Sequence, residues 1–287
     1  MQLFLQQSVN GLLLGGMFAL ISIGLSLMFG IMKVANFAYG ALYMLGGYAA
    51  FWASNLLGVP NWVAILVAFA AAFMMGVLME GLGFAKFRGN EEATLIFGLG
   101  VALIARGGAV LAWGSQSRFI PFSFNTYRIG GLVLPAARIW ACVASLAIVA
   151  GVYFVVNRTA WGRIIRAVSD NAERARLVGF NTRLHYLLTA GLATGLAGTA
   201  SVLLIPVFSL SPAVDDSALY TAMAVVILGG LGSIPGCIVG GLVLGIVTAF
   251  AFGYLPSPIA PAIPLLLLIL TLAFKPDGLF GSAERAV

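Results

Sequence analysis

Residues 161–179 read WGRIIRAVSDNAERARLVG, and this charged stretch stands between long apolar runs. The pattern predicts a short helix. Asp170 is expected to cap it by accepting a backbone N–H, and Glu173, three residues later, completes a capping box. Gly179 is expected to end it, because glycine tolerates the left-handed conformation there. A capped helix between membrane spans indicates a docking element; the alternative is a plain basic loop that follows the positive-inside rule.

The composition places the chain in a membrane. It is 61% hydrophobic and 8% charged, whereas soluble domains carry about 25% charged residues. The net charge of +6 does not indicate nucleic acid, because the Lys and Arg residues are scattered between apolar runs. Cys142 and Cys237 both lie in apolar sequence and are expected to be buried thiols. No metal site and no cofactor is expected.

Apolar runs of about 20 residues are long enough to cross a bilayer. We therefore expect an all-α protein, a polytopic transmembrane bundle of about eight to nine segments, some of them broken, forming one transmembrane domain over residues 1–287. The expected spans are 9–31, 37–57, 62–85, 94–113, 139–156 and 184–206, then a broken apolar region at 218–252 that crosses twice or enters and returns, and a final span at 259–274.

Basic residues orient these spans. They fall at alternate ends of the spans, and the loop at 158–183 alone holds six. By the positive-inside rule those ends are cytoplasmic. The loop at 209–217, with Asp215 and Asp216, is then expected outside. Three basic residues oppose this orientation, because they fall in a loop expected outside: Arg118, Arg128 and Arg138. They are fewer than the six of the loop at 158–183.

The outer loop is expected to carry a short hairpin. Residues 127–129 and 132–134 have strand character and flank a Gly-Gly turn. The hairpin is interpreted either as an external docking surface or as a lid over the helix ends.

Two segments interrupt the apolar pattern and are candidates for a translocation path. Residues 229–236, GGLGSIPG, cannot form a continuous helix, and broken helices build many transport sites. The alternative is a tight turn at the cytoplasmic surface. The second segment, 36–40, opens a span with polar groups that line a path or lie at the interface. We expect the two segments to approach each other; the candidate path residues are Asn36, Tyr39, Gly40, Gly230, Gly232 and Ser233.

Ionisable residues inside spans are functional candidates. Glu80 and Arg106 qualify, and they are interpreted as a structural pair with each other or as solute contacts. His185 is the single histidine and is expected at the membrane interface. The sequence shows no nucleophile elbow and no phosphate-binding loop, so an enzyme is not expected.

Several blocks together resemble one family. They are the first span from Asn10-Gly11-Leu12 to Gly24-Leu25-Ser26-Leu27, the segment NFAYG at 36–40, the charged loop at 162–179, LGGLGSIPG at 228–236 and FKPDGLFG at 274–281. In order and spacing they resemble the permease subunits of branched-chain amino acid ABC importers, almost from end to end. Tyr39 and Ala41 depart from the family's common His and acidic residue, and Arg106 stands where a neutral residue is common. Because the family includes urea and short amide importers, the substrate is open.

The resemblance implies alternating access without covalent chemistry. Its implied partners are a second, homologous permease, two ATPase subunits and an extracytoplasmic solute-binding protein, in a bacterial inner membrane. The loop at 158–183 is implied to dock on the ATPase, with Ala167, Val168, Ala175 and Val178 among the packed residues. The implied coupling residues are Gly162, Arg163, Arg166, Ala167, Asp170, Asn171, Glu173, Ala175, Arg176 and Gly179. The competing hypothesis is a channel or secondary carrier that works alone.

Overall fold

The fold is described from a computed structural model, which covers the chain except residues 35, 121–124, 130, 257–258, 276–277 and 281–287. Within these described residues, nine helices of 12 residues or more form a bundle, so the expected all-α polytopic fold is confirmed. They are α1 (Gln2–Leu27), α2 (Tyr39–Leu57), α3 (Asn61–Met79), α5 (Glu91–Trp113), α6 (Ala136–Arg158), α9 (Thr182–Leu204), α10 (Val214–Gly229), α11 (Ile234–Tyr254) and α12 (Ile263–Phe274).

Shorter elements continue or connect these helices. Two π-helical turns extend long helices: η1 (Met28–Met32) follows α1, and η2 (Glu80–Phe84) follows α3 and leads into α4 (Ala85–Phe87). The loop after α6 holds α7 (Ala160–Asp170) and α8 (Ala172–Leu177), and the 3-10 turn η3 (Ala260–Ala262) precedes α12. The expected broken region at 218–252 is two helices, α10 and α11, joined by a tight turn.

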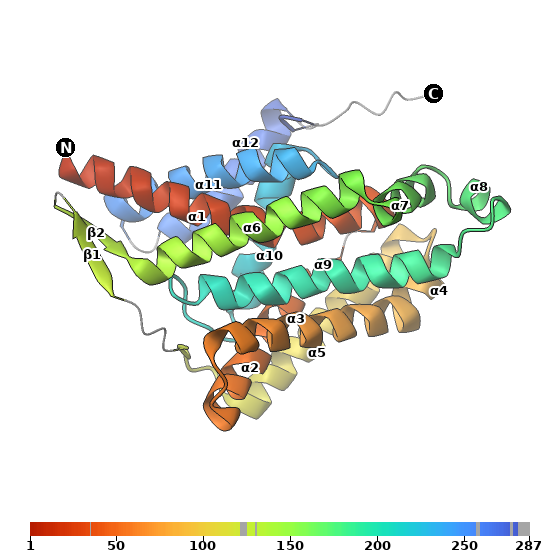
Figure 1. The fold of residues 1–287 in the computed structure, drawn as a ribbon, viewed down its shortest axis with the longest axis horizontal. Helices are drawn as coiled ribbons and strands as arrows, with labels where there is room; N and C mark the ends of the chain where they lie inside the picture. The colour runs from red at the N-terminus through yellow and green to blue at the C-terminus, as the bar shows by residue number, and fades with distance from the viewer. Residues whose placement is uncertain (35, 121–124, 130, 257–258, 276–277, 281–287) are drawn as a thin grey trace.

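The molecule has two distinct ends. In Figure 1, α1, α3, α6 and α9 run side by side along its length, with α7 and α8 at one end and the β-hairpin at the other. The hairpin pairs β1 (Thr126–Ile129) with β2 (Leu132–Pro135), Tyr127 opposite Leu134, as the sequence predicts. The Gln6 side chain both donates to and accepts from the backbone of Val133, at 2.9 Å each, and so ties the hairpin to the start of α1.

Glycines bring the central helices together. α1 and α11 run antiparallel, and a Cβ added to Gly15 would lie 2.7 Å from the Cα of Leu242. On the other side of the bundle, the same addition to Gly198 of α9 would lie 2.7 Å from the Cβ of Ala72 in α3. Such close backbone approaches are how membrane helices associate when lipid removes the hydrophobic drive between them. The glycines of α9 and α11 that have such close neighbours therefore serve helix packing.

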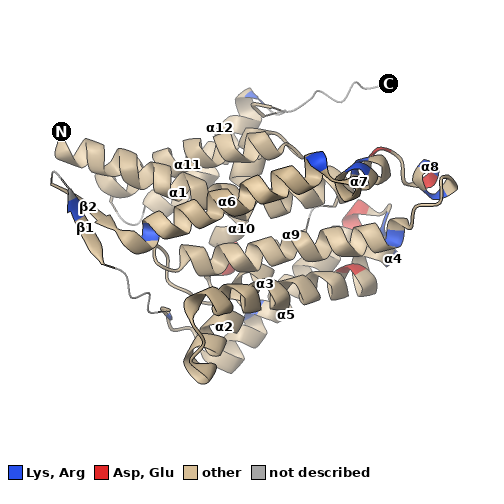
Figure 2. Ribbon diagram, viewed as in Figure 1, with Lys and Arg blue, Asp and Glu red and all other residues tan. Residues whose placement is uncertain are grey.

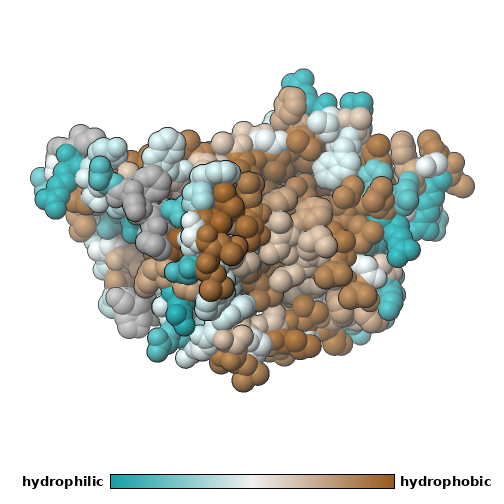
Figure 3. Space-filling model, turned by 60° about the horizontal axis from the view of Figure 1, so that its bottom comes forward, coloured by the Kyte–Doolittle hydropathy of each residue, from teal (hydrophilic) through white to brown (hydrophobic). Residues whose placement is uncertain are grey.

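Charge and hydropathy follow the long axis. Basic residues crowd the end that carries α7 and α8, with fewer at the hairpin end (Figure 2). The face in Figure 3 is apolar through its middle, and hydrophilic residues gather toward its two ends. Six of the long helices are apolar enough to cross a membrane by length and composition. The chain is thus a multi-pass membrane protein.

Candidate functional site

The charged stretch forms two helices rather than one, and its caps differ from those predicted. α7 begins at the cap Thr159, whose Oγ1 accepts from Gly162 N at 3.2 Å. Asp170 is the last residue of α7 and caps nothing. Asn171 has the extended backbone that a cap needs, and its Oδ1 accepts from Arg174 N at 2.9 Å. The predicted cap at Asp170 and its capping box with Glu173 are therefore wrong.

The predicted stop at Gly179 is confirmed. Its φ is +92°, in the left-handed region. Phe180 N donates to Ala175 O at 3.1 Å, and Gly179 N donates to Arg176 O at 2.9 Å. This pair of bonds is the Schellman arrangement, which satisfies the last carbonyls of a helix. α8 consequently ends abruptly, and the chain turns back into α9.

Several predicted coupling residues are buried against the chain itself. Gly162 lies against Val156 O, where a Cβ would collide. Ile165, Val168 and Ala175 are part of the main hydrophobic core. Val168 and Ala175 therefore cannot be surface-packing residues as predicted. They hold α7 and α8 in place instead.

Polar bonds complete this anchoring. Ser169 Oγ donates to Gly30 O of η1 at 2.6 Å. Arg166 donates to Val156 O at the end of α6, and Arg176 Nε donates to Thr182 Oγ1 at the start of α9 at 3.0 Å. The loop is thus bonded to the ends of three long helices, so a force on it reaches all three.

What remains exposed is a mixed surface at the tip. Its charged members are Arg163, Asp170, Glu173 and Arg174, together with the anchoring Arg166 and Arg176, which are exposed as well. Its apolar members include Leu177 and Val178, which are 88% and 75% exposed. In Figure 1, α8 projects beyond the neighbouring helix ends. An exposed apolar pair on a rigid projection fits a partner's groove.

The glycine-rich break at 229–236 is a tight turn at the α7 end, as the alternative interpretation held. Gly230 and Gly232 have φ of +100° and +79°, and Ser233 caps α11 by accepting from Gly236 N at 3.1 Å. Gly232 packs on Gly30 of η1. With Ser26, Arg166 and Ser169, among others, it lines a cleft of about 300 Å³. Gly232 and Ser233 therefore face α7 across this cleft, whereas Asn36 lines a different recess.

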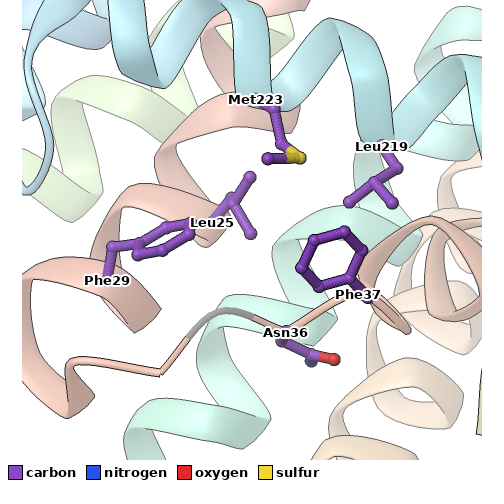
Figure 4. Close-up of a pocket in the computed structure, with 6 residues that line it drawn as sticks. All are labelled: Leu25, Phe29, Asn36, Phe37, Leu219 and Met223. Carbon is purple, nitrogen blue, oxygen red and sulfur yellow. The ribbon is translucent and has the colours of Figure 1, made fainter. Parts of the chain in front are cut away.

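The segment at 36–40 turns the chain back into the bundle. Asn36 Oδ1 accepts from Ala38 N at 2.9 Å and so starts the turn into α2. Tyr39 is fully buried, and its hydroxyl donates to Ile21 O of α1 at 2.6 Å. Gly40 lies against the backbone of Asp215. Tyr39 and Gly40 thus join helices in this conformation, while Asn36 also lines a shallow recess (Figure 4).

The two ionisable residues inside spans do not pair with each other. Glu80 is buried in η2 and bonds Arg88, which also stacks on the Tyr186 ring with 3.6 Å to the centroid. This clamp joins the end of α3 to the start of α9. One interpretation from sequence, a Glu80–Arg106 pair, is therefore wrong, because Glu80 is paired locally with Arg88, eight residues later in the chain.

Arg106 of α5 pairs with the first turn of α10. It bonds Asp216, and its Nη1 lies 3.7 Å from Asp215 Oδ1. Asp215 is buried and belongs to the first turn of α10 rather than to a loop, and its expected place on the outer side of the membrane stays a prediction. Sequence reasoning assigned both aspartates to an external loop. The available signal was charge balance: an intramembrane arginine needs an acid, and these two directly precede an apolar run.

Comparison with known proteins agrees with this architecture. Residues 7–272 match the family model described as the permease component of branched-chain amino acid transport systems. The chain is 32% identical to the permease protein BraD of Pseudomonas aeruginosa over 98% of its own length and 97% of the relative's. It is also 32% identical to LivH of Escherichia coli, over 98% and 96%.

A structural neighbour, PsaBC from Streptococcus pneumoniae, has a TM-score of 0.46 and 14% identity over 96% of this chain and 92% of that one. BraD and LivH are both named as high-affinity branched-chain amino acid transport permeases, not as enzymes. The match to the family model spans nearly the whole chain. The chain therefore belongs to the family of branched-chain amino acid transport permeases.

Proposed function

We propose that this chain is one permease subunit of an ATP-driven importer in a bacterial inner membrane. Residues 1–287 act as a single transmembrane domain, with the α7 end in the cytoplasm, where basic residues concentrate. The cargo is a small polar solute, a branched-chain amino acid or a related amino acid or amide. A second, homologous permease forms the other half of the path, and a binding protein delivers the solute from outside.

One observation carries this proposal: the exposed tip of α8 on a rigidly anchored loop. Leu177 and Val178 enter a groove on one ATPase subunit, and the surrounding charges pair with that subunit. When two ATPase subunits close on ATP, the loop moves as a unit. The bond from Ser169 to Gly30 passes this motion to η1 and α1, and the path opens by rigid-body shifts of helices.

The test is co-purification of the ATPase subunits with the detergent-solubilised permease. Leu177→Asp is expected to reduce ATPase recovery at least tenfold, because burying one carboxylate in an apolar groove costs more than the roughly 1.4 kcal/mol of a tenfold change. The matched control is Leu57→Asp, an exposed leucine at the end of α2. It is expected to leave recovery unchanged.

The outcomes separate the two classes of transporter. If no ATPase accompanies the unaltered chain, and it still transports solute alone in liposomes, it is a channel or carrier and the proposal is wrong. If ATPase accompanies both variants equally, docking does not use the α8 tip. Membrane-inserted protein is quantified in each case so that poor insertion is not read as lost docking.

A further inference from the structure

The cleft of about 300 Å³ beside α7 has no part in the proposed docking of the α8 tip. Four elements enclose it: the last turns of α6, the end of α1 with η1, α7 itself, and the glycine-rich turn that leads into α11. Two of them, α6 and η1, also accept the hydrogen bonds of Arg166 and Ser169 that anchor α7. An occupant of the cleft would therefore brace α7 against the bundle at the same place.

Polar groups with unused hydrogen-bond donors line this cleft. Arg166 makes both of its hydrogen bonds through Nη1, to Val156 O and to Asn157 Oδ1. Within the described residues, Nε and Nη2 of this exposed guanidinium have no partner. The Ser233 hydroxyl accepts from Gly236 N and, over the same part of the chain, donates to no group. A guanidinium edge and a hydroxyl are thus left to bind something that enters the cleft.

A third polar group lies on the buried side of the cleft. Ser26 of α1 is 1% exposed, and its Oγ makes no hydrogen bond within the residues that the structure describes. The neighbouring Cys237 thiol is only a weak partner for it. Buried hydroxyls nearly always have a partner, because an unsatisfied one destabilises the fold. A polar occupant of the cleft would supply the partner that Ser26 lacks.

The charge around the cleft favours an anion. Residues 158–170 hold three arginines and one acidic residue, Asp170. α11 begins at the cleft with its cap Ser233, and the N-terminus of a helix carries a partial positive charge. Phosphate oxygens pair bidentately with a guanidinium and also bind at helix N-termini. A phosphate group therefore matches the donors and the charge of this cleft.

The remaining lining is apolar and points to a lipid as the source of the phosphate. Tyr153 lines the cleft and is 45% exposed on α6, where Phe154 is 61% exposed. α6 is apolar enough to cross a membrane, so acyl chains can lie along this surface while the headgroup enters the cleft. A water-soluble anion gains nothing from an apolar wall. Basic pockets between membrane helices at the cytoplasmic side are typical sites for anionic headgroups.

We propose that the cleft beside α7 binds the phosphate of an anionic phospholipid, and that the bound lipid braces α7 against α1 and α11. Arg166 pairs with the phosphate through Nε and Nη2, Ser233 donates to it, and Ser26 gains a partner. The inference goes beyond the proposed function and takes from it only the orientation, with the α7 end in the cytoplasmic leaflet.

The test follows the melting temperature of the purified full-length chain in detergent as a ligand is added. The probes are phosphatidylglycerol, phosphatidylcholine with the same acyl chains, and glycerol phosphate, which is the water-soluble headgroup alone. A ligand that binds the folded chain raises the melting temperature with its concentration, and the shift gives an apparent Kd. Phosphatidylglycerol is expected to bind about tenfold more tightly than either of the other two, because it alone has both the net charge and the acyl chains.

Three variants examine the residues that carry the proposal. Arg166→Gln is expected to weaken phosphatidylglycerol binding about tenfold, because it removes the charged donor. The matched control is Arg163→Gln, an exposed arginine of α7 that does not line the cleft, and it is expected to change the affinity less than about twofold, since salt screens distant charges. Because Arg166→Gln also removes the bond to Val156 O, each variant is compared with its own lipid-free melting temperature.

Ser26→Ala separates a binding role from a structural one. It is expected to weaken phosphatidylglycerol binding about threefold, while the lipid-free chain melts at the same temperature or higher, because the variant removes a buried hydroxyl that had no hydrogen-bond partner. If Arg166→Gln does not fold, Ser26→Ala decides, and an unchanged affinity there overturns the proposal.

Two further outcomes would overturn the lipid site. Equal phosphatidylglycerol affinities of Arg166→Gln and Arg163→Gln, or equal binding of phosphatidylglycerol and phosphatidylcholine, would mean that lipid only surrounds the bundle. Glycerol phosphate that binds as tightly as phosphatidylglycerol would mean that the occupant is a soluble phosphate compound. All of these outcomes leave the proposed function standing, because none of them measures the recovery of ATPase.

Discussion

α1 and α5 are both long, apolar helices, yet they occupy opposite environments. The most apolar stretch of α1 with η1 is 83% buried inside the chain, whereas that of α5 is 11% buried. α1 contacts α6, α9, α10 and α11, and α5 lies at the margin of the bundle. Hydropathy reports that a helix enters the membrane, and it does not report whether protein or lipid surrounds it there.

The glycines of the two helices show the difference in packing. In α1, a Cβ on Gly15 or Gly24 would collide with the backbone of a neighbouring helix. In α5, a Cβ on Gly100, Gly107 or Gly108 would meet nothing within 4 Å. Glycine in a membrane helix is therefore a packing device only where a second backbone reaches it. These three glycines of α5 lie on its open face, whereas Gly98 of the same helix is buried against Phe37.

The largest expected loss of stability comes from adding a methyl group where α1 packs most tightly on its neighbours. In Gly24→Ala, the new Cβ would collide with Ala193 O of α9 and with the Tyr39 hydroxyl. Neither can move freely, because one is helix backbone and the other is bonded to Ile21 O. We expect a loss of about 3 kcal/mol in unfolding free energy, at the upper end for overpacking. Thermal melting of the purified chain in detergent measures it, and an unchanged midpoint would mean that α1 and α9 are less closely packed.

The charged groups differ in burial as the two helices do. The substitution Arg88→Ala tests this difference, and its effect on stability is expected to be intermediate. Glu80 is buried beside Arg88, whereas Arg106 is partly exposed. Arg88→Ala leaves Glu80 without its cation, and the carboxyl then loses a buried hydrogen bond. We expect a loss of about 2 kcal/mol, because Glu80 can take up a proton and so avoid the full charge penalty.

A second substitution checks that reason. Adding Glu80→Gln to Arg88→Ala removes the unpaired charge, and the double variant is expected to melt at a higher temperature than Arg88→Ala alone. If the double variant melts no higher than Arg88→Ala, the unpaired carboxyl does not cause the loss, and the stacking of Arg88 on Tyr186, which both variants lack, is the dominant contribution. The same melting assay reads both variants.

Much of the fold could be predicted from the sequence, and the rest depends on contacts between distant helices. The spans, the hairpin and the stop at Gly179 follow from local patterns. The cap was misplaced by one residue because Asp170 and Asn171 are both good capping residues and only the backbone geometry selects Asn171. Arg106 was recognised as unusual, but its partners are 109 and 110 residues away and belong to a helix predicted to start at 218. Which apolar helix is central, α1 or α5, has no local signature.

The smallest expected effect is the sharpest test of the comparison, because it uses the same substitution as the largest one. Gly107→Ala adds a methyl group to the open face of α5. With no neighbour to strike, only helix propensity remains, and alanine is favoured over glycine by about 0.5–1 kcal/mol in helix interiors. The isolated chain is therefore expected to melt at the same temperature or slightly higher, opposite in sign to Gly24→Ala. A lower melting point for the isolated chain would contradict the open face of α5. A normal melting point combined with weaker association in the assembled transporter would identify this face of α5 as the surface that meets the second permease, since closely packed membrane helices have small residues at their interfaces.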